Sequence, residues 1–119
     1  MWYFKAPGSV SRLSPSGKFY LTCDDTDWGR ITQYREVADD QSAVRQVDMY
    51  ENGNVLRYDR SHRRDDYGSL IGLKFSRKPK WVVYFPAAEI ISSGEFEKVW
   101  QTALMSPLWE LQVASRRIG

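Results

Sequence analysis

The only histidine of the chain, His62, lies within a charged and aromatic segment that runs from Arg57 to Tyr67. An imidazole can act as a general base, and neighbouring arginines could stabilise a phosphorane, so this segment has the side chains for metal-independent RNA cleavage. Such cleavage usually needs a second proton-transfer group with a near-neutral pKa, and the sequence contains no second histidine. We therefore predict that the chain is not an enzyme and has no catalytic residue. A nuclease centred on His62 remains an alternative.

The same segment carries side chains that bind charged surfaces. They are arginines with forked donors and tyrosines with flat rings, namely Arg60, Arg63, Arg64, Tyr58 and Tyr67. An RNA- or DNA-binding module that uses residues 57–64 is therefore another alternative. However, three aspartates that would repel phosphate are interleaved with the arginines: Asp59, Asp65 and Asp66. Alternating charges suit a protein surface better, so we expect this loop, His62 included, to contact a protein rather than nucleic acid.

A second candidate site is the acidic cluster formed by Asp24, Asp25 and Asp27, which precedes Trp28. Clustered oxygen ligands favour Ca²⁺ or Mg²⁺, but the glycine and the glutamate that the EF-hand loop requires at fixed places are missing. We expect no metal and no cofactor, and we interpret the cluster as a turn with acidic tips. Its three aspartates and Trp28 are predicted to belong to the partner-binding surface.

Charge is unevenly distributed along the chain of 119 residues, although the net charge is only +2. Residues 24–51 contain eight acids and three bases, and residues 57–80 contain eight bases and three acids. Blocks of opposite sign can neutralise each other or can steer a charged partner. The small net charge does not by itself indicate nucleic-acid binding.

Several classes of protein do not fit this sequence. No apolar run is long enough to span a membrane, and the N-terminus lacks the pattern of a secretory signal. The single cysteine, Cys23, cannot form an internal disulfide, which fits a reducing compartment. We therefore expect a cytoplasmic protein without a membrane partner.

The element that positions the His62 segment is a predicted β-hairpin. Residues 43–50 and 55–60 alternate apolar and polar side chains, with Val47 and Met49 on one face of the first strand. Residues 51–54 contain Asn-Gly, which tolerates the positive φ of a tight turn. The hairpin thus ends where a charged loop, residues 61–68, begins.

The C-terminal part of the chain has helical spacing. Ser92 and Glu95 are spaced as in a capping box, and one apolar stripe follows at Phe96, Val99, Trp100, Ala103 and Leu104. A second short helix is predicted at 108–117, with Leu108, Leu111 and Trp109 facing inward. Further extended segments are predicted at 2–6, 18–23, 28–37, 69–75 and 80–85.

Strands that precede helices indicate an α+β fold in a single domain spanning residues 1–119. We expect an antiparallel sheet of about five strands with one or two C-terminal helices packed on one face. The other face is expected to meet water or a partner. As an oligomer, the chain is expected to be a monomer or a weak homodimer, and a structural subunit that pairs through an open sheet edge is a further alternative.

Two motifs together carry a resemblance to a known family. Residues 45–53 read R-x-V-x-x-Y-x-N-G, and residues 95–100 read E-F-E-x-x-W. This order resembles a small uncharacterised bacterial domain family, over about half of the chain. Small single-domain bacterial proteins of this kind are often immunity partners of polymorphic or contact-dependent toxins. The resemblance implies no catalytic residues.

The resemblance and the charge pattern lead to one functional expectation. We expect a non-enzymatic protein-binding domain, an immunity protein that binds and neutralises a bacterial toxin domain such as a nuclease. Inhibitors of nucleases are usually acidic, whereas this chain is slightly basic, with an isoelectric point of about 8.7. Its partner would therefore be acidic overall, or would dock on the acidic block alone.

Overall fold

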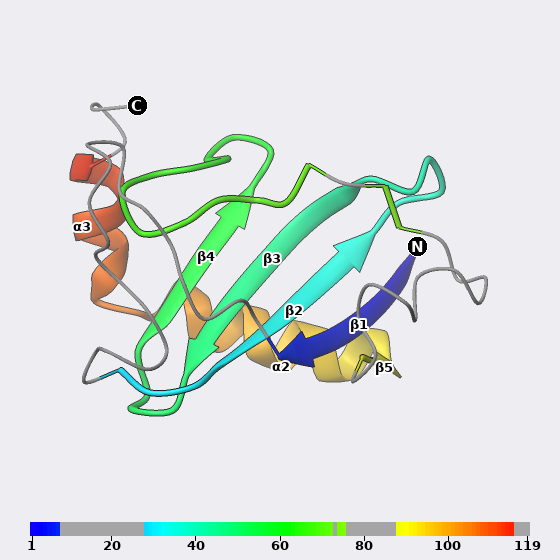
Figure 1. The fold of residues 1–119 in the computed structure, drawn as a ribbon, viewed down its shortest axis with the longest axis horizontal. Helices are drawn as coiled ribbons and strands as arrows, with labels where there is room; N and C mark the ends of the chain where they lie inside the picture. Colours follow the sequence, from blue (N-terminus) through cyan, green and yellow to red (C-terminus); the bar gives the residue numbers. More distant parts are fainter. Residues whose placement is uncertain (8–27, 73, 76–87, 116–119) are drawn as a thin grey trace.

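A computed structural model describes residues 1–7, 28–72, 74–75 and 88–115 (Figure 1). It contains five strands and two helices, namely β1 (Trp2–Pro7), β2 (Ile31–Val37), β3 (Ala43–Tyr50), β4 (Val55–Asp59), β5 (Glu89–Ile91), α2 (Ser93–Leu104) and α3 (Leu108–Ser115). The strands form one antiparallel sheet in the order β4-β3-β2-β1-β5. The predicted α+β fold is confirmed.

The predicted hairpin is formed by β3 and β4. Gly53 has a φ of +95°, and the amide of Asn54 donates to the side chain of Asn52 at 2.9 Å, which closes the turn. Val47 pairs with Arg57, and Asp48 pairs with Leu56. Because side chains alternate across a strand, this register sends Leu56 and Tyr58 to one face of the sheet.

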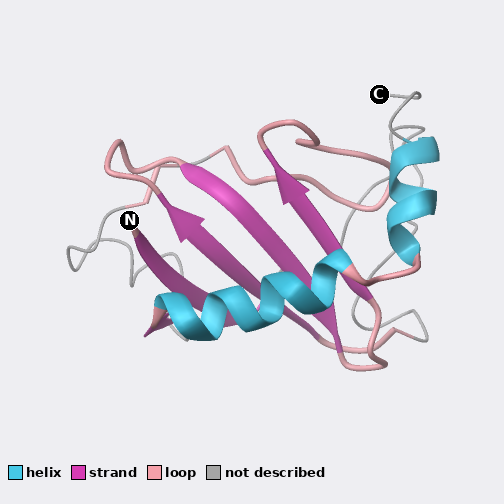
Figure 2. Cartoon of the chain, turned by 180° about the vertical axis from the view of Figure 1, so that it is seen from behind, coloured by secondary structure: helices cyan, strands magenta, loops and turns pink. Residues whose placement is uncertain are grey.

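Helix α2 covers the other face of the sheet, as Figure 2 shows from behind. It begins where predicted, because the side chain of Ser92 accepts a hydrogen bond from the amide of Glu95 at 3.1 Å. Phe96, Trp100 and Ala103 are buried against Val47 and Val55. Leu104 departs from the predicted stripe: it ends the helix and is 43% exposed.

The face opposite α2 is not left open. A second apolar cluster lies there, made of Phe4, Ala6, Ile31, Val37, Ala43, Tyr50, Leu56, Tyr58, Leu70 and Phe75. Leu70 and Phe75 come from the chain that follows β4, so this segment covers part of the sheet itself. The prediction that this face meets water or a partner is therefore wrong for the part that Leu70 and Phe75 cover.

Three further expectations need correction. Residues 69–75 form no strand among those described, but only single bridges, between Ser69 and Arg64 and between Lys74 and Ser42. Strand β5 was not predicted, because it has only three residues. In α3, Leu111 is 51% exposed and Gln112 is the buried residue. The predicted strands at 18–23 and 80–85 lie outside the described residues.

The segment before β2 has its own local explanation. Gly29 has a φ of +80°, and a Cβ there would lie 2.6 Å from a carboxylate oxygen of Glu51. The neighbouring Trp28 packs against Tyr50 with ring centroids 4.9 Å apart. Strand β2 therefore begins at Ile31, three residues later than predicted.

Within the described residues, no helix is long and apolar enough to cross a membrane.

Candidate functional site

The chain turns sharply directly after β4, and Asp59 fixes that turn. One of its carboxylate oxygens accepts from the Ser61 amide at 2.9 Å, the Ser61 hydroxyl at 2.7 Å and the His62 amide at 2.9 Å. Burial by itself raises the pKa of Asp59, but these hydrogen bonds outweigh it, so the pKa lies below its ordinary value. We call residues 60–70, which begin within this turn, the arginine loop.

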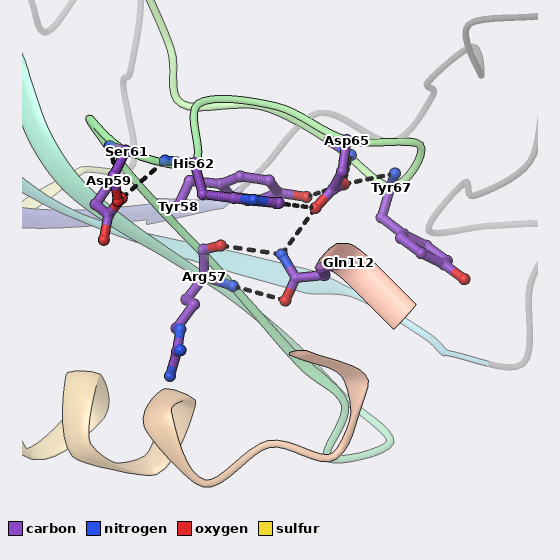
Figure 3. Close-up of polar contacts among 9 residues, drawn as sticks. Arg57, Tyr58, Asp59, Ser61, His62, Asp65, Tyr67 and Gln112 are labelled. Carbon is purple, nitrogen blue, oxygen red and sulfur yellow. Dashed lines mark hydrogen bonds and ion pairs between the residues drawn. The ribbon is translucent and has the colours of Figure 1, made fainter. Parts of the chain in front are cut away.

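Asp65 anchors the middle of the arginine loop from inside the protein (Figure 3). Its side chain is fully buried. One carboxylate oxygen accepts from the Tyr58 hydroxyl at 2.9 Å and from the amides of Tyr67 and Gly68 at 2.8 and 3.2 Å. The bonds to Tyr67 and Gly68 fold the chain back on itself, and the bond to Tyr58 ties the loop to β4.

The second carboxylate oxygen of Asp65 joins two further elements. It lies 2.8 Å from Nε2 of His62 and accepts from the amide group of Gln112, on α3, at 3.0 Å. A single buried carboxylate therefore connects β4, the arginine loop and α3. We call Tyr58, His62, Asp65 and Gln112 the Asp65 network.

His62, the candidate general base, lies inside the protein. It is 1% exposed, whereas the sequence suggested an exposed loop position. Its ring packs against the rings of Tyr58 and Trp109, with centroids 6.0 and 4.8 Å away. Nε2 is engaged with Asp65, and Nδ1 is buried without a hydrogen-bond partner among the described residues. A substrate could not reach either nitrogen without a rearrangement.

Gln112 also covers the open edge of the sheet. Its side-chain amide accepts from the backbone amide of Arg57 at 3.3 Å and donates to the backbone carbonyl of Arg57 at 2.9 Å. The hydroxyl of Ser106 donates to the carbonyl of Val55 at 2.8 Å. These bonds satisfy backbone groups of β4 that an edge strand leaves unpaired. No local sequence signal indicated this role, because Gln112 lies 55 residues from its partner.

The arginines of the loop lie on its outer side. Arg60, Arg63 and Arg64 are exposed. Arg60 donates to the hydroxyl of Ser42 at 2.8 Å. Among the described residues, neither the Arg63 nor the Arg64 side chain has an ion pair or a hydrogen bond.

Nearby carboxylates do not neutralise the loop equally. Hydrogen bonds from Ser42 lower the pKa of Asp40, and the charges of Lys74 and Arg60 lower it further. Asp40 therefore balances part of the charge of Lys74 and Arg60. Arg63 and Arg64 form no ion pair with a described carboxylate.

The aromatic residues predicted to bind a partner are turned mainly inward. Tyr58 is fully buried, so like His62 it holds the loop instead of offering a contact surface. Trp28 and Tyr67 are half-buried and stack on each other with centroids 6.2 Å apart. The predicted contact residues Asp24, Asp25 and Asp27 lie outside the described residues.

A second charged region lies under α2, and its members pair with one another. The guanidinium of Arg45 donates to Glu36 at 2.6 and 2.9 Å, contacts Glu97, and lies 5.0 Å from the ring centroids of Phe96 and Trp100. Lys5 pairs with Glu95 at 3.2 Å and with Glu89 at 3.5 Å. We call these charged residues the helix-side cluster.

The pKa values of the helix-side cluster follow from this pairing. Hydrogen bonding to Glu36 raises the pKa of Arg45. Burial raises the pKa of Glu36, but the hydrogen bonds and charge of Arg45 outweigh it, so the pKa of Glu36 is lowered. The charges of this cluster are therefore used within the fold.

The remaining buried polar residues also have internal roles. Arg35, Gln46 and Asp48 lie on the sheet face opposite α2 and are at most 2% exposed. Gln46 accepts from Arg35 at 3.1 Å, donates to Asp48 at 3.0 Å, and binds the backbone of Ser69 and Ile71 at 3.0 and 3.2 Å. Across the part of the chain that the structure describes, no group of three acidic, histidine or cysteine residues could hold a metal ion.

Comparisons with known proteins identify no family for this chain. No protein-family model, no curated protein and no solved structure matches the chain. The resemblance drawn from the R-x-V-x-x-Y-x-N-G and E-F-E-x-x-W motifs therefore stays a prediction.

Proposed function

We propose that this chain is a non-enzymatic protein-binding domain, and that it acts as an immunity protein that neutralises a bacterial toxin domain by forming a stoichiometric complex. The observation that carries the proposal is the contrast between buried and exposed charged residues in the arginine loop. Its histidine and its central aspartate are buried, whereas Arg63 and Arg64 are exposed and unpaired among the described residues.

The buried position of His62 argues against catalysis at this site. A general base must lie within hydrogen-bond reach of the proton that it removes. Nε2 of His62 is engaged with Asp65, and the ring packs against Tyr58 and Trp109. A nuclease centred on His62 is therefore not favoured.

Nucleic-acid binding is the second candidate, and one observation favours it more than the sequence did. Asp65, which was expected to repel phosphate, points inward and is buried. Single-stranded nucleic acid, however, is bound by aromatic platforms beside the basic groups. Tyr58 is buried, and Tyr67 stacks on Trp28. A protein partner consequently fits the loop better.

The test is co-expression with the polypeptide encoded directly upstream of this chain. We expect that polypeptide, or its C-terminal domain, to arrest growth when expressed alone, and this chain to restore growth. Light scattering after size exclusion should then show a complex of fixed stoichiometry. If the two proteins form no complex, or if the purified chain turns over a substrate and a point change abolishes that turnover, the proposal fails.

A further inference from the structure

We infer that Arg63 and Arg64 form the docking element of this domain, and that they bind a carboxylate-rich surface of the partner protein. This inference rests on the proposed function and adds the site and the chemistry of recognition. The basis is that the two arginines are exposed, adjacent in sequence and unpaired among the described residues. An arginine fork matches a carboxylate through two parallel hydrogen bonds.

The backbone that carries the two arginines is fixed before binding. The carbonyl of Arg63 accepts from the amide of Leu70 at 2.6 Å, and Arg64 pairs with Ser69 in a single bridge. Leu70 itself is buried in the apolar cluster. Little backbone freedom is therefore lost when a partner docks, which favours affinity.

The two arginines are flanked in the sequence by buried residues. His62 precedes Arg63, Asp65 follows Arg64, and the two flanking side chains contact each other at 2.8 Å. The two residues between them are exposed to solvent. His62 and Asp65 are thus positioning residues, and the arginines are the contact residues.

Carboxylates suit this site better than a polynucleotide. A nucleic-acid surface needs several phosphate contacts and, for single strands, exposed rings for stacking. Here only two cations are without an ion pair among the described residues of the loop segment 63–64, and the neighbouring aromatic residues Tyr58 and Tyr67 are engaged within the fold. Two forked donors on a stiff loop match a pair of acidic side chains on a protein.

The experiment compares four forms of the full chain by calorimetric titration against the upstream polypeptide. These forms are the wild type, the double variants R63E/R64E and R63A/R64A, and the matched control R30E/K98E. Arg30 and Lys98 are exposed, and their side chains make no ion pair or hydrogen bond among the described residues. The control also replaces two cations by two glutamates, so it carries the same change of charge. Urea unfolding of each form verifies that the fold is retained.

We expect the affinity of R63E/R64E to fall by about 100-fold or more, and that of R30E/K98E to change by less than about threefold. R63A/R64A should fall by about 10-fold, because truncation removes attraction without adding repulsion. If all forms bind equally, the docking site is wrong while the proposed function stands.

If the wild type does not bind the upstream polypeptide, the proposed function fails, and two probes then test the docking chemistry. We expect a deca-glutamate peptide to bind the wild type and R30E/K98E but not R63E/R64E. Binding of a 20-nucleotide RNA or DNA with no binding of the peptide would overturn the inference in favour of nucleic acid. Absence of binding to every probe would also overturn it.

Discussion

The helix-side cluster and the arginine loop contain the same kinds of charged residues but use them differently. Under α2, Arg45 pairs with Glu36 and Glu97, and Lys5 pairs with Glu89 and Glu95. In the arginine loop, the carboxylate of Asp65 faces the interior and binds neutral donors and His62. The arginines beside it face solvent.

We propose that this difference separates stabilisation from recognition. A cation that already has carboxylate partners offers little to a second protein, because its attraction is satisfied within the fold. A cation without partners on a fixed backbone retains its attraction for an incoming carboxylate. Charge composition alone therefore does not separate paired from unpaired cations, whereas the direction in which each carboxylate points does.

The most severe way to break the arginine loop is Asp65→Ala. The change removes the acceptor for Tyr58, His62 and Gln112, and for two backbone amides. We expect the free energy of unfolding to fall by about 3 kcal/mol, because buried donors are left without acceptors. Urea unfolding followed by fluorescence measures it. Asp39→Ala, at a nearly fully exposed carboxylate, should change stability by less than about 0.5 kcal/mol. Equal effects of the two variants would contradict the role of Asp65.

Gln112→Ala tests whether α3 closes the sheet edge. The variant removes the bonds to the backbone of Arg57 and the bond to Asp65. We expect a loss of about 2 kcal/mol and faster hydrogen exchange at the Arg57 amide, which NMR would detect. Glu110→Ala, at an exposed position of the same helix, is the control. Unchanged exchange at Arg57 would show that the edge is protected by other means.

Arg45→Ala tests the helix-side cluster. The change leaves Glu36, which is 5% exposed, without its main cation and removes packing over Phe96 and Trp100. We expect a loss of about 1.5 kcal/mol in unfolding free energy, with no loss of partner binding. Lys98→Ala, on the exposed side of α2, should be silent in both measurements. Loss of binding without loss of stability in Arg45→Ala would reverse the assignment of the two regions.

The smallest expected effect is the pH dependence of the same ion pair. The pKa of Glu36 is lowered from its ordinary value of 4.5, so its stabilising contribution is present above that value and is lost as pH falls through the folded-state pKa. The difference in unfolding free energy between wild type and Arg45→Ala should therefore shrink as pH falls below 4.5. A difference that stays constant or grows toward acid pH would disagree with the pairing.

The sequence predicted the parts of this fold that are determined locally. The hairpin of β3 and β4 has alternating side chains and an Asn-Gly turn, and α2 has a serine cap and a regular stripe. Strand β5 was missed because three residues carry no period, and it forms only by pairing with β1. Residues 69–75 were predicted to be a strand, but Leu70 and Phe75 instead pack onto the sheet from a loop.

The candidate site was predicted only in part, for a similar reason. Arg60, Arg63 and Arg64 were assigned to an exposed loop, and they are exposed. The burial of His62 depends on Trp109 and Asp65, and that of Asp65 depends on Gln112. Trp109 and Gln112 lie 47 residues from His62 and Asp65, respectively, and contacts over such a separation leave no local pattern.

Hydrogen–deuterium exchange of the full chain, free and bound to the upstream polypeptide, tests the central claim most directly. The account predicts that binding slows exchange across residues 60–66 and leaves α2 unchanged. If binding slows exchange in α2 and leaves exchange in residues 60–66 unchanged, the account is contradicted, because the partner would then dock on the charges that the fold already pairs.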